Sequence, residues 1–418
     1  MENMARHIRR RACPRAIALR FAAGDSSMAP RCFFPRHMHP HAGESMIRSR
    51  RRVALVVVAT SVGGPAAWFG ISAARDAMAM QARVAASCPR PQAFPAPARS
   101  STPSVLGTTG QIFVSHAWSR RVFIIDVATG RVTPLAAGIA DAHEVAVSPD
   151  GRWGVAADFG DYQGDYKFDG RRLAVFDLRT KRLTRVIELG SYLGPHDLVF
   201  HPTSPTRLFV TTQTTRHVIE VDVATGQVLG ATETRAVGSH TMAVTADGRT
   251  AFTANEPEGS VSRLDLAGRK FVAKHSVGPG PTEGIGVTPD GREVWMGFLK
   301  DGEVRVVDGD SGALLATIEG FVTPARLTLS PDGSRAVVAD GGCKRTQVVD
   351  VRSRKLLGHI VGLDEGFGVA KVLPDNRSAV IAVLDAKLVA MVDLEERRVI
   401  RKFDLGVRMD AAAWGPKP

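Results

Sequence analysis

A short pattern recurs seven times along this chain and constrains its fold more than any other feature. In each copy an aspartate ends a run of β-forming residues and is followed by a turn, as in "FIIDVATGR" and "QVVDVRSRK". The seven aspartates are Asp126, Asp177, Asp222, Asp265, Asp308, Asp350 and Asp393. Successive copies are 51, 45, 43, 43, 42 and 43 residues apart, a period that fits four short strands and their turns per repeat.

A second repeated feature marks a tight turn in most of the repeats. "SPDGR" at 148–152 has the counterparts "TADGR", "TPDGR", "SPDGS" and "LPDNR". Proline fixes φ at the second position of such a turn, and Asp-Gly adopts the backbone conformations that the turn needs. The seven β-rich repeats therefore predict an all-β fold, a seven-bladed β-propeller, over residues 105–418.

The two ends of the repeat region predict how the ring closes. Residues 110–138 hold enough β-forming sequence for three strands, and the last segment, "RMDAAAWGPKP", resembles a single inner strand. We expect this C-terminal strand to complete the blade begun by the N-terminal three, because closure removes exposed strand edges. No helix of useful length is predicted after residue 105.

These blades resemble the YVTN-repeat and lactonase-like seven-bladed β-propeller family. The resemblance covers residues 110–418 and rests on the pieces "VSPDGR" and "DVATG". It implies a propeller and a mostly exported group of bacterial proteins. The family includes enzymes, cofactor carriers and plain binding modules, so the resemblance leaves the function open.

The basic charge of the chain is concentrated in its first quarter. Residues 1–104 hold 16 Arg and four acidic residues, whereas residues 105–418 hold 38 basic and 38 acidic residues. The repeat region is therefore neutral, which argues against a nucleic-acid partner. Only Cys343 of the four cysteines lies in it, which excludes a disulfide within the repeats and a cysteine-based zinc site there.

The N-terminal quarter is interpreted as a leader. We expect residues 1–45 to be an unstructured extension, 46–80 a signal peptide or membrane anchor, and 81–104 a Pro/Ser-rich linker. Arginines precede 22 uncharged residues, 53–74, and "SRRRVAL" resembles a twin-arginine export signal. We therefore expect an extracytoplasmic protein, periplasmic or secreted, either cleaved after "AMA" or anchored by residues 53–74. A disordered basic tail is the alternative.

One column of the aligned repeats is rich in metal-ligating residue types. The first residue of each inner strand is expected at one mouth of the central channel, where equivalent positions converge. In chain order this column holds His143, His196, His240, Glu283, Ala325, Gly368 and Asp410. Three imidazoles and a carboxylate on adjacent blades suit Zn, Fe, Mn or Cu, so the column predicts a divalent transition metal bound by its first four members. The alternative is that the histidines pack between blades and bind no metal.

Further polar residues are predicted at the same end. His116 lies in the blade that contains Asp410, and one or the other, Asp410 or His116, is expected to carry protons during catalysis. The 51-residue spacing marks an insertion at 158–172 that is expected to act as a lid or substrate-selecting loop or, in the simpler interpretation, to form a solvated hairpin. The residues expected to bind substrate are Tyr162, Tyr166, Tyr192 and Asp158, although a turn cap is the simpler role for Asp158.

Two functions follow from these features. The first is a metal-dependent enzyme, a lyase or hydrolase or an oxidoreductase, that acts on a small polar molecule at the channel mouth. The second is a non-catalytic propeller that binds a ligand or a protein partner on the same face. The sequence contains no Ser-His-Asp nucleophile motif, phosphate loop or dinucleotide fingerprint, and a membrane is expected to be contacted only through the leader.

Overall fold

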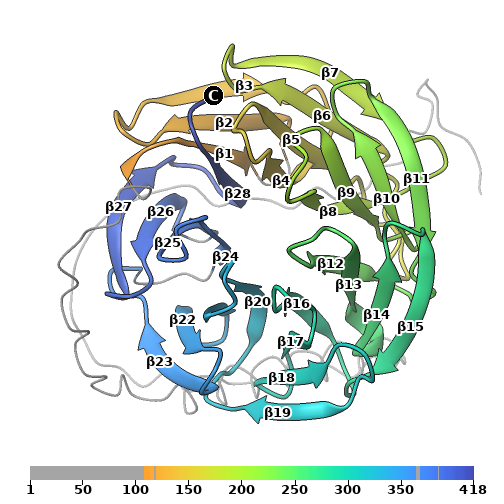
Figure 1. Ribbon diagram of the computed structural model, residues 1–418. Helices are drawn as coiled ribbons and strands as arrows, with labels where there is room; N and C mark the ends of the chain where they lie inside the picture. The colour runs from red at the N-terminus through yellow and green to blue at the C-terminus, as the bar shows by residue number, and fades with distance from the viewer. Residues whose placement is uncertain (1–107, 117–118, 364–367, 385) are drawn as a thin grey trace, which may run out of the picture. The chain divides into compact units, whose positions relative to one another are not determined.

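A computed structural model of the chain describes residues 108–116, 119–363, 368–384 and 386–418. These residues form seven four-stranded antiparallel sheets arranged in a ring, so the predicted seven-bladed β-propeller is confirmed (Figure 1). The predicted leader, anchor and linker within residues 1–104 lie outside the described residues. Within them, the helix η2 (Glu256–Glu258) is a single 3-10 turn, and no helix is long and apolar enough to span a membrane.

The first blade joins the two ends of the described chain. From the centre outwards its strands are β28 (Met409–Gly415), β1 (Gln111–His116), β2 (Arg121–Asp126) and β3 (Val132–Ala136). Strand β28 pairs antiparallel with β1, with Phe113 opposite Ala413. The C-terminal strand therefore lies innermost and closes the ring, as the sequence predicts (Figure 1).

The other six blades each use four strands in chain order, from the centre outwards. Blade 2 holds β4 (Ala142–Val147), β5 (Trp153–Asp158), β6 (Arg172–Asp177) and β7 (Arg182–Glu188). Blade 3 holds β8 (Pro195–Phe200), β9 (Arg207–Thr212), β10 (His217–Asp222) and β11 (Gln227–Glu233). Blade 4 holds β12 (Ser239–Val244), β13 (Thr250–Asn255), β14 (Ser260–Asp265) and β15 (Lys270–Ser276).

The last three blades complete the ring. Blade 5 holds β16 (Thr282–Val287), β17 (Glu293–Phe298), β18 (Glu303–Asp308) and β19 (Leu314–Ile318). Blade 6 holds β20 (Pro324–Leu329), β21 (Arg335–Asp340), β22 (Arg345–Asp350) and β23 (Lys355–His359). Blade 7 holds β24 (Gly368–Val372), β25 (Ser378–Val383), β26 (Leu388–Asp393) and β27 (Arg398–Asp404).

The seven repeated aspartates all fix the same outer turn. Each ends the third strand of its blade and accepts a backbone N–H from the residue three positions later, at 2.7–2.9 Å. A short carboxylate side chain bonds its own backbone readily in this way. The repeated aspartates are therefore explained by the turn between the third and fourth strands of each blade. They carry no information about function.

The hydrophobic core lies in layers between neighbouring blades. The rings of Phe113 in blade 1 and Phe176 in blade 2 are 5.2 Å apart, and Ala411 of β28 joins the same buried cluster. The closing segment is also held by polar contacts, because Trp414 Nε1 donates to Thr109 O at 2.8 Å. Gly151 must lack a side chain, since a Cβ there would lie 1.9 Å from the Pro416 carbonyl oxygen.

Candidate metal centre

The histidine column lies at irregular points of the inner strands. His143, His196 and His240 are the second residues of β4, β8 and β12, one place later than the sequence predicts. In all three strands the pairing with the next strand shifts register around this residue. Such a bulge re-aims side chains, so consecutive residues such as His143 and Glu144 lose the strict alternation of a regular strand.

Hydroxyl groups from the preceding blade bind the carbonyl groups at these bulges. Ser115 Oγ in blade 1 donates to His143 O at 2.5 Å, and Thr211 Oγ1 in blade 3 donates to His240 O at 2.9 Å. A bulge interrupts the ladder and leaves backbone groups unpaired, so each hydroxyl supplies a partner that the strand pairing does not. The positions of His143 and His240 are therefore each fixed by two blades.

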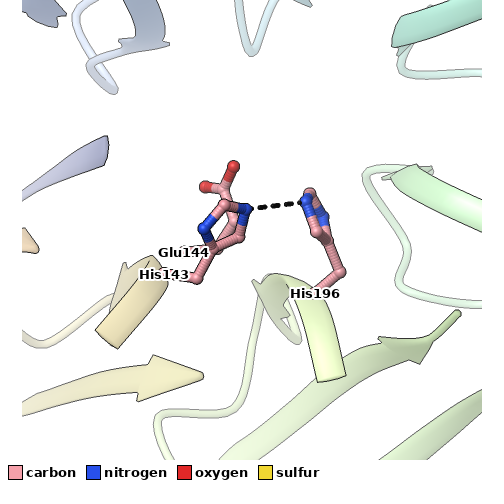
Figure 2. A group of neighbouring side chains, drawn as sticks. All are labelled: His143, Glu144 and His196. Atoms are coloured by element: carbon pink, nitrogen blue, oxygen red, sulfur yellow. Dashed lines mark hydrogen bonds between the residues drawn. The ribbon is translucent and has the colours of Figure 1, made fainter. Parts of the chain in front are cut away.

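The three imidazole rings converge. The ring centroids of His143 and His196 are 4.8 Å apart, and those of His196 and His240 are 3.8 Å apart. Nε2 of His143 lies 3.1 Å from Nε2 of His196, and the two rings face each other edge to edge across this contact (Figure 2). These distances exclude the alternative in which the three histidines are packed far apart between blades.

The distance between these nitrogens suits two ligands of one ion. In a tetrahedral zinc site with Zn–N bonds of 2.0–2.1 Å, two ligand nitrogens are about 3.3 Å apart. A carboxylate oxygen of Glu144 joins them, and the three ligand atoms all lie within 4.8 Å of one another. Within the described part of the chain, His143, Glu144 and His196 are the His, Cys and acidic side chains close enough to hold one ion. These three residues are therefore a candidate metal site, which closes around one ion only when the ligand atom farthest from the others moves closer to them.

His240 and Glu283, which the sequence also predicts as ligands, lie beside this group. His240 Nε2 is 3.6 Å from Glu283 Oε1, and that oxygen lies 2.9 Å from Nε of Arg326. Burial disfavours ionisation of Glu283, but Arg326 and His240 outweigh it and lower the pKa of the carboxyl group to about 2. Glu283 is thus an ionised partner of Arg326.

Two of the histidines have an acceptor on Nδ1. The carboxylate of Asp410 contacts Nδ1 of His143, and Oε1 of Gln213 lies 2.9 Å from Nδ1 of His240. An acceptor there holds the proton on Nδ1 and leaves the Nε2 lone pair free, which is the usual outer arrangement around a metal-bound histidine. Burial opposes the charged form of His143, but Asp410 and Glu144 outweigh it and raise its pKa.

His196 is the most deeply buried of the three. Its side chain is inaccessible to solvent, and its Nδ1 has no hydrogen-bond partner among the described residues. Burial, followed by the neighbouring His240 and His143, holds its pKa well below the usual value. A neutral imidazole is the form that binds a metal ion.

Asp158 and His116 have different surroundings. Asp158 is buried, its Oδ2 accepts from Arg172 Nε at 2.8 Å, and its Oδ1 accepts the Asp141 N–H at 2.9 Å. These contacts favour the capping role for Asp158. His116 ends β1, with its ring 6.0 Å from that of Phe123, and no contact within the described residues joins it to Asp410. The structure brings Asp410 to His143 instead.

The three tyrosines spread over the rim. Tyr162 is 62% exposed and lies beside Phe168, at 5.3 Å between centroids. Tyr166 extends towards blade 4, since a Cβ on Gly238 would lie 3.7 Å from its ring. Tyr192 packs edge-on against His217 at 5.5 Å. The structure therefore places Tyr162 and Tyr166 on the insertion, whereas Tyr192 is packed into blade 3.

The insertion covers the histidines with aromatic rings. Phe159 stacks on His143 at 4.8 Å and meets His196 edge-on at 4.7 Å, and Phe168 stacks on Phe159 at 3.6 Å. The insertion is tied to blade 3, because Phe168 N–H donates to Thr214 Oγ1 at 2.7 Å and that hydroxyl donates to Phe168 O at 2.8 Å. This geometry supports a covering role over a solvated hairpin.

Charged residues that were not predicted as site residues lie one position after the histidines in the aligned inner strands. Glu144, Asp197 and Arg326 occupy this position, and all three line a cavity of about 390 Å³ together with Lys371. Arg326 Nη2 lies 3.3 Å from Glu144 Oε1. The same repeat alignment, advanced by one residue, would have shown these buried charges.

The fold and this cluster define a seven-bladed β-propeller with a buried His/Glu group near the starts of its inner strands. No known protein-family profile matches the chain, and no curated protein sequence matches it. Among solved structures it is similar to a chain of Kuenenia stuttgartiensis Hydrazine Synthase, with a TM-score of 0.54 and 17% sequence identity. That match covers 70% of this chain and 97% of the other. At this identity the similarity supports the propeller fold and nothing about activity.

Proposed function

We propose that this protein is a metal-dependent enzyme that binds a divalent transition metal ion, Zn, Fe, Mn or Cu, through His143, His196 and Glu144. The observation that carries the proposal is the 3.1 Å separation of the two Nε2 atoms next to a carboxylate. Two imidazoles and one carboxylate form a common catalytic ligand set, because they leave positions open for water or substrate. The reaction class would be a lyase, hydrolase or oxidoreductase step on a small polar molecule.

Each neighbouring residue has a defined task in this proposal. The metal ion would polarise a substrate oxygen or activate water. Asp410 orients His143 through Nδ1 and is the nearest carboxylate to accept a proton from that ring. Arg326 keeps Glu283 ionised and holds the carboxyl group of Glu144, whose pKa is raised by burial, in position beside the ion.

The first experiment is elemental analysis of untagged protein purified from its native compartment. We expect about one transition-metal ion per chain, and the variants His143→Gln and His196→Asn should each reduce it to background. His201→Gln is the matched control, because that histidine is half-buried in the turn after β8, and within the described residues its imidazole bonds only to Thr203. Folding of each variant is checked by circular dichroism and thermal melting. Folded wild-type protein without a bound ion after equilibration with each metal would refute the proposal.

The second candidate is a non-catalytic propeller that binds a ligand or a protein partner. One observation favours it: a single proton shared between the two Nε2 atoms at 3.1 Å satisfies the pair without a metal. Glu144 would then serve only as a partner for Arg326. Under this alternative His196→Asn leaves the metal content at background and lowers the melting temperature, since it replaces a buried imidazole.

We also propose that the protein acts outside the cytoplasm, in the periplasm or as a secreted protein. The support is the run of arginines before the uncharged residues 53–74 and the neutral repeat region. A fusion of residues 46–110 to a reporter that is active only outside the cytoplasm should give a signal. Changing Arg50 and Arg51 to Lys should abolish that signal if the twin-arginine route is used.

A further inference from the structure

The insertion in blade 2 borders a second cavity, here called the rim cavity, of about 730 Å³. It shares no lining residue with the 390 Å³ cavity lined by Glu144, Asp197 and Arg326, here called the channel cavity. His143 lines the rim cavity, whereas the adjacent Glu144 lines the channel cavity, so the metal-binding group lies between the two. The rim cavity is large enough for a ligand of roughly drug-fragment size.

The rim cavity is negatively charged. Its lining includes one ion pair that cancels, because both Nε and Nη2 of Arg172 lie 2.8 Å from Asp158 Oδ2. His143 also lines the cavity and is paired with Asp410, which lies outside the lining. The other charged side chains of the lining are four carboxylates and one guanidinium: Asp141, Asp161, Asp169, Glu188 and Arg171. A cavity with this balance attracts cations and repels anions.

Aromatic rings form one wall of the same cavity. Phe159 and Phe168 are stacked on each other, and Phe159 is stacked on His143. Tyr162 lines the cavity and is 62% exposed, so it is the member of this group whose ring is most accessible to a ligand. Aromatic faces attract organic ammonium groups and also pack against apolar substituents, whereas they offer little to a hydrated metal ion.

We propose that the rim cavity binds a small organic cation, a primary or substituted ammonium carrying an apolar group, and presents it to the His143 side of the cluster. The carboxylates would neutralise the ammonium, and the aromatic wall would take up the apolar group. This inference rests on the proposed function only for the chemistry at the cluster. Binding itself involves the insertion and needs no bound metal.

The test is isothermal titration calorimetry on the full chain, with metal removed by a chelator and again after reloading. The probes are 2-phenylethylammonium and, as an anion of similar size, 3-phenylpropionate. We expect the ammonium to bind with one site per chain and more weakly as salt is added, and the carboxylate not to bind. Equal binding of both probes, or no binding of the ammonium, overturns the inference.

Variants of residues on and beside the insertion test whether the ammonium binds in the rim cavity. Asp161→Asn combined with Glu188→Gln removes two exposed charges whose side chains form no hydrogen bonds within the described residues, and should weaken binding of the ammonium about threefold to tenfold. Tyr162→Ala should weaken it by a similar factor. Glu319→Gln, an exposed charge after β19 across the ring, is the control and should have no effect (Figure 1). Variants that bind like the control would place the cation elsewhere and refute the inference.

The two proposals fail in different ways. Ammonium binding without any uptake of metal would retain the rim site and refute the metal centre. Metal uptake that depends on His143 and His196, without ammonium binding, would retain the metal centre and refute the rim site.

Discussion

The carboxylate of Asp410, on the last strand of the chain, contacts Nδ1 of His143 in the second blade. The strand that closes the ring therefore also supplies the group that orients a histidine of the candidate metal centre. Closure and assembly of the site are thus coupled through a single side-chain contact.

Asp410→Asn should weaken metal binding while the fold is retained. The amide either loses its contact with Nδ1 or offers a neutral acceptor, so His143 is held less firmly and is a weaker ligand. Loss of an outer carboxylate of this kind typically lowers metal affinity by about 10–100-fold. Competition with a chromophoric chelator measures the change, and Asp404→Asn on the exposed outer strand β27 is the control. Equal affinity in both variants would show that Asp410 does not position His143.

Glu283 should make the stability of the protein dependent on acid pH. Its pKa is about 2 in the folded protein, against 4.5 ordinarily. The carboxylate therefore contributes stability above pH 4.5, and this contribution is lost as the pH falls from 4.5 through 2. The shift corresponds to about 3 kcal/mol, and Glu283→Gln should remove this part of the pH dependence. Urea unfolding between pH 2 and 7 measures it, and an unchanged slope in the variant would contradict the assignment.

Asp197 should matter for stability and not for metal binding. Its two carboxylate oxygens accept the N–H groups of Leu198 and Met242, both at 2.9 Å, and so connect β8 to β12. Asp197→Ala leaves two buried N–H groups without partners, at a cost of about 1–3 kcal/mol. Chemical unfolding gives the loss of stability, and elemental analysis of the same sample should give the wild-type metal content. A loss of metal at unchanged stability would assign Asp197 to the site instead.

Deletion of residues 408–418 should destabilise the whole ring. It removes β28 and exposes the inner edge of β1, which promotes aggregation of an otherwise closed structure. We expect a much lower melting temperature or insoluble protein. Deletion of residues 417–418 alone removes only the 2.9 Å ion pair between Lys417 and Asp126 and should change the melting temperature little. Equal melting of the two truncated proteins would contradict the role of β28 in closure.

The fold could be predicted from sequence because its signals are local. The turn after each third strand depends on one aspartate and its own backbone, so the period of the aspartates reports the period of the blades. Alignment on the turns before the second strands then placed His143, His196 and His240 in one column. The rings do lie together, since equivalent positions of neighbouring inner strands are close in a propeller.

The composition of the site could not be predicted in the same way. A regular strand directs neighbouring side chains to opposite faces, so strand alternation predicts that Glu144 points away from His143. The bulge in β4 removes that alternation, and no local signal announces a bulge in "AHEVAV". The cover provided by Phe159 was equally hidden, because the path of the insertion depends on Thr214 in the next blade.

The stacked pair of Phe159 and Phe168 has a kinetic consequence for an ion bound beneath it. On the insertion side, an ion held by His196 is separated from solvent by these rings, and Thr214 holds their loop closed. A chelator approaching from that side has to wait until the loop opens. Removal of the ion by this route should then reach a plateau as chelator concentration increases, and the plateau is the opening rate of the insertion. Removal through the channel cavity, which Glu144 lines, continues to rise with chelator concentration.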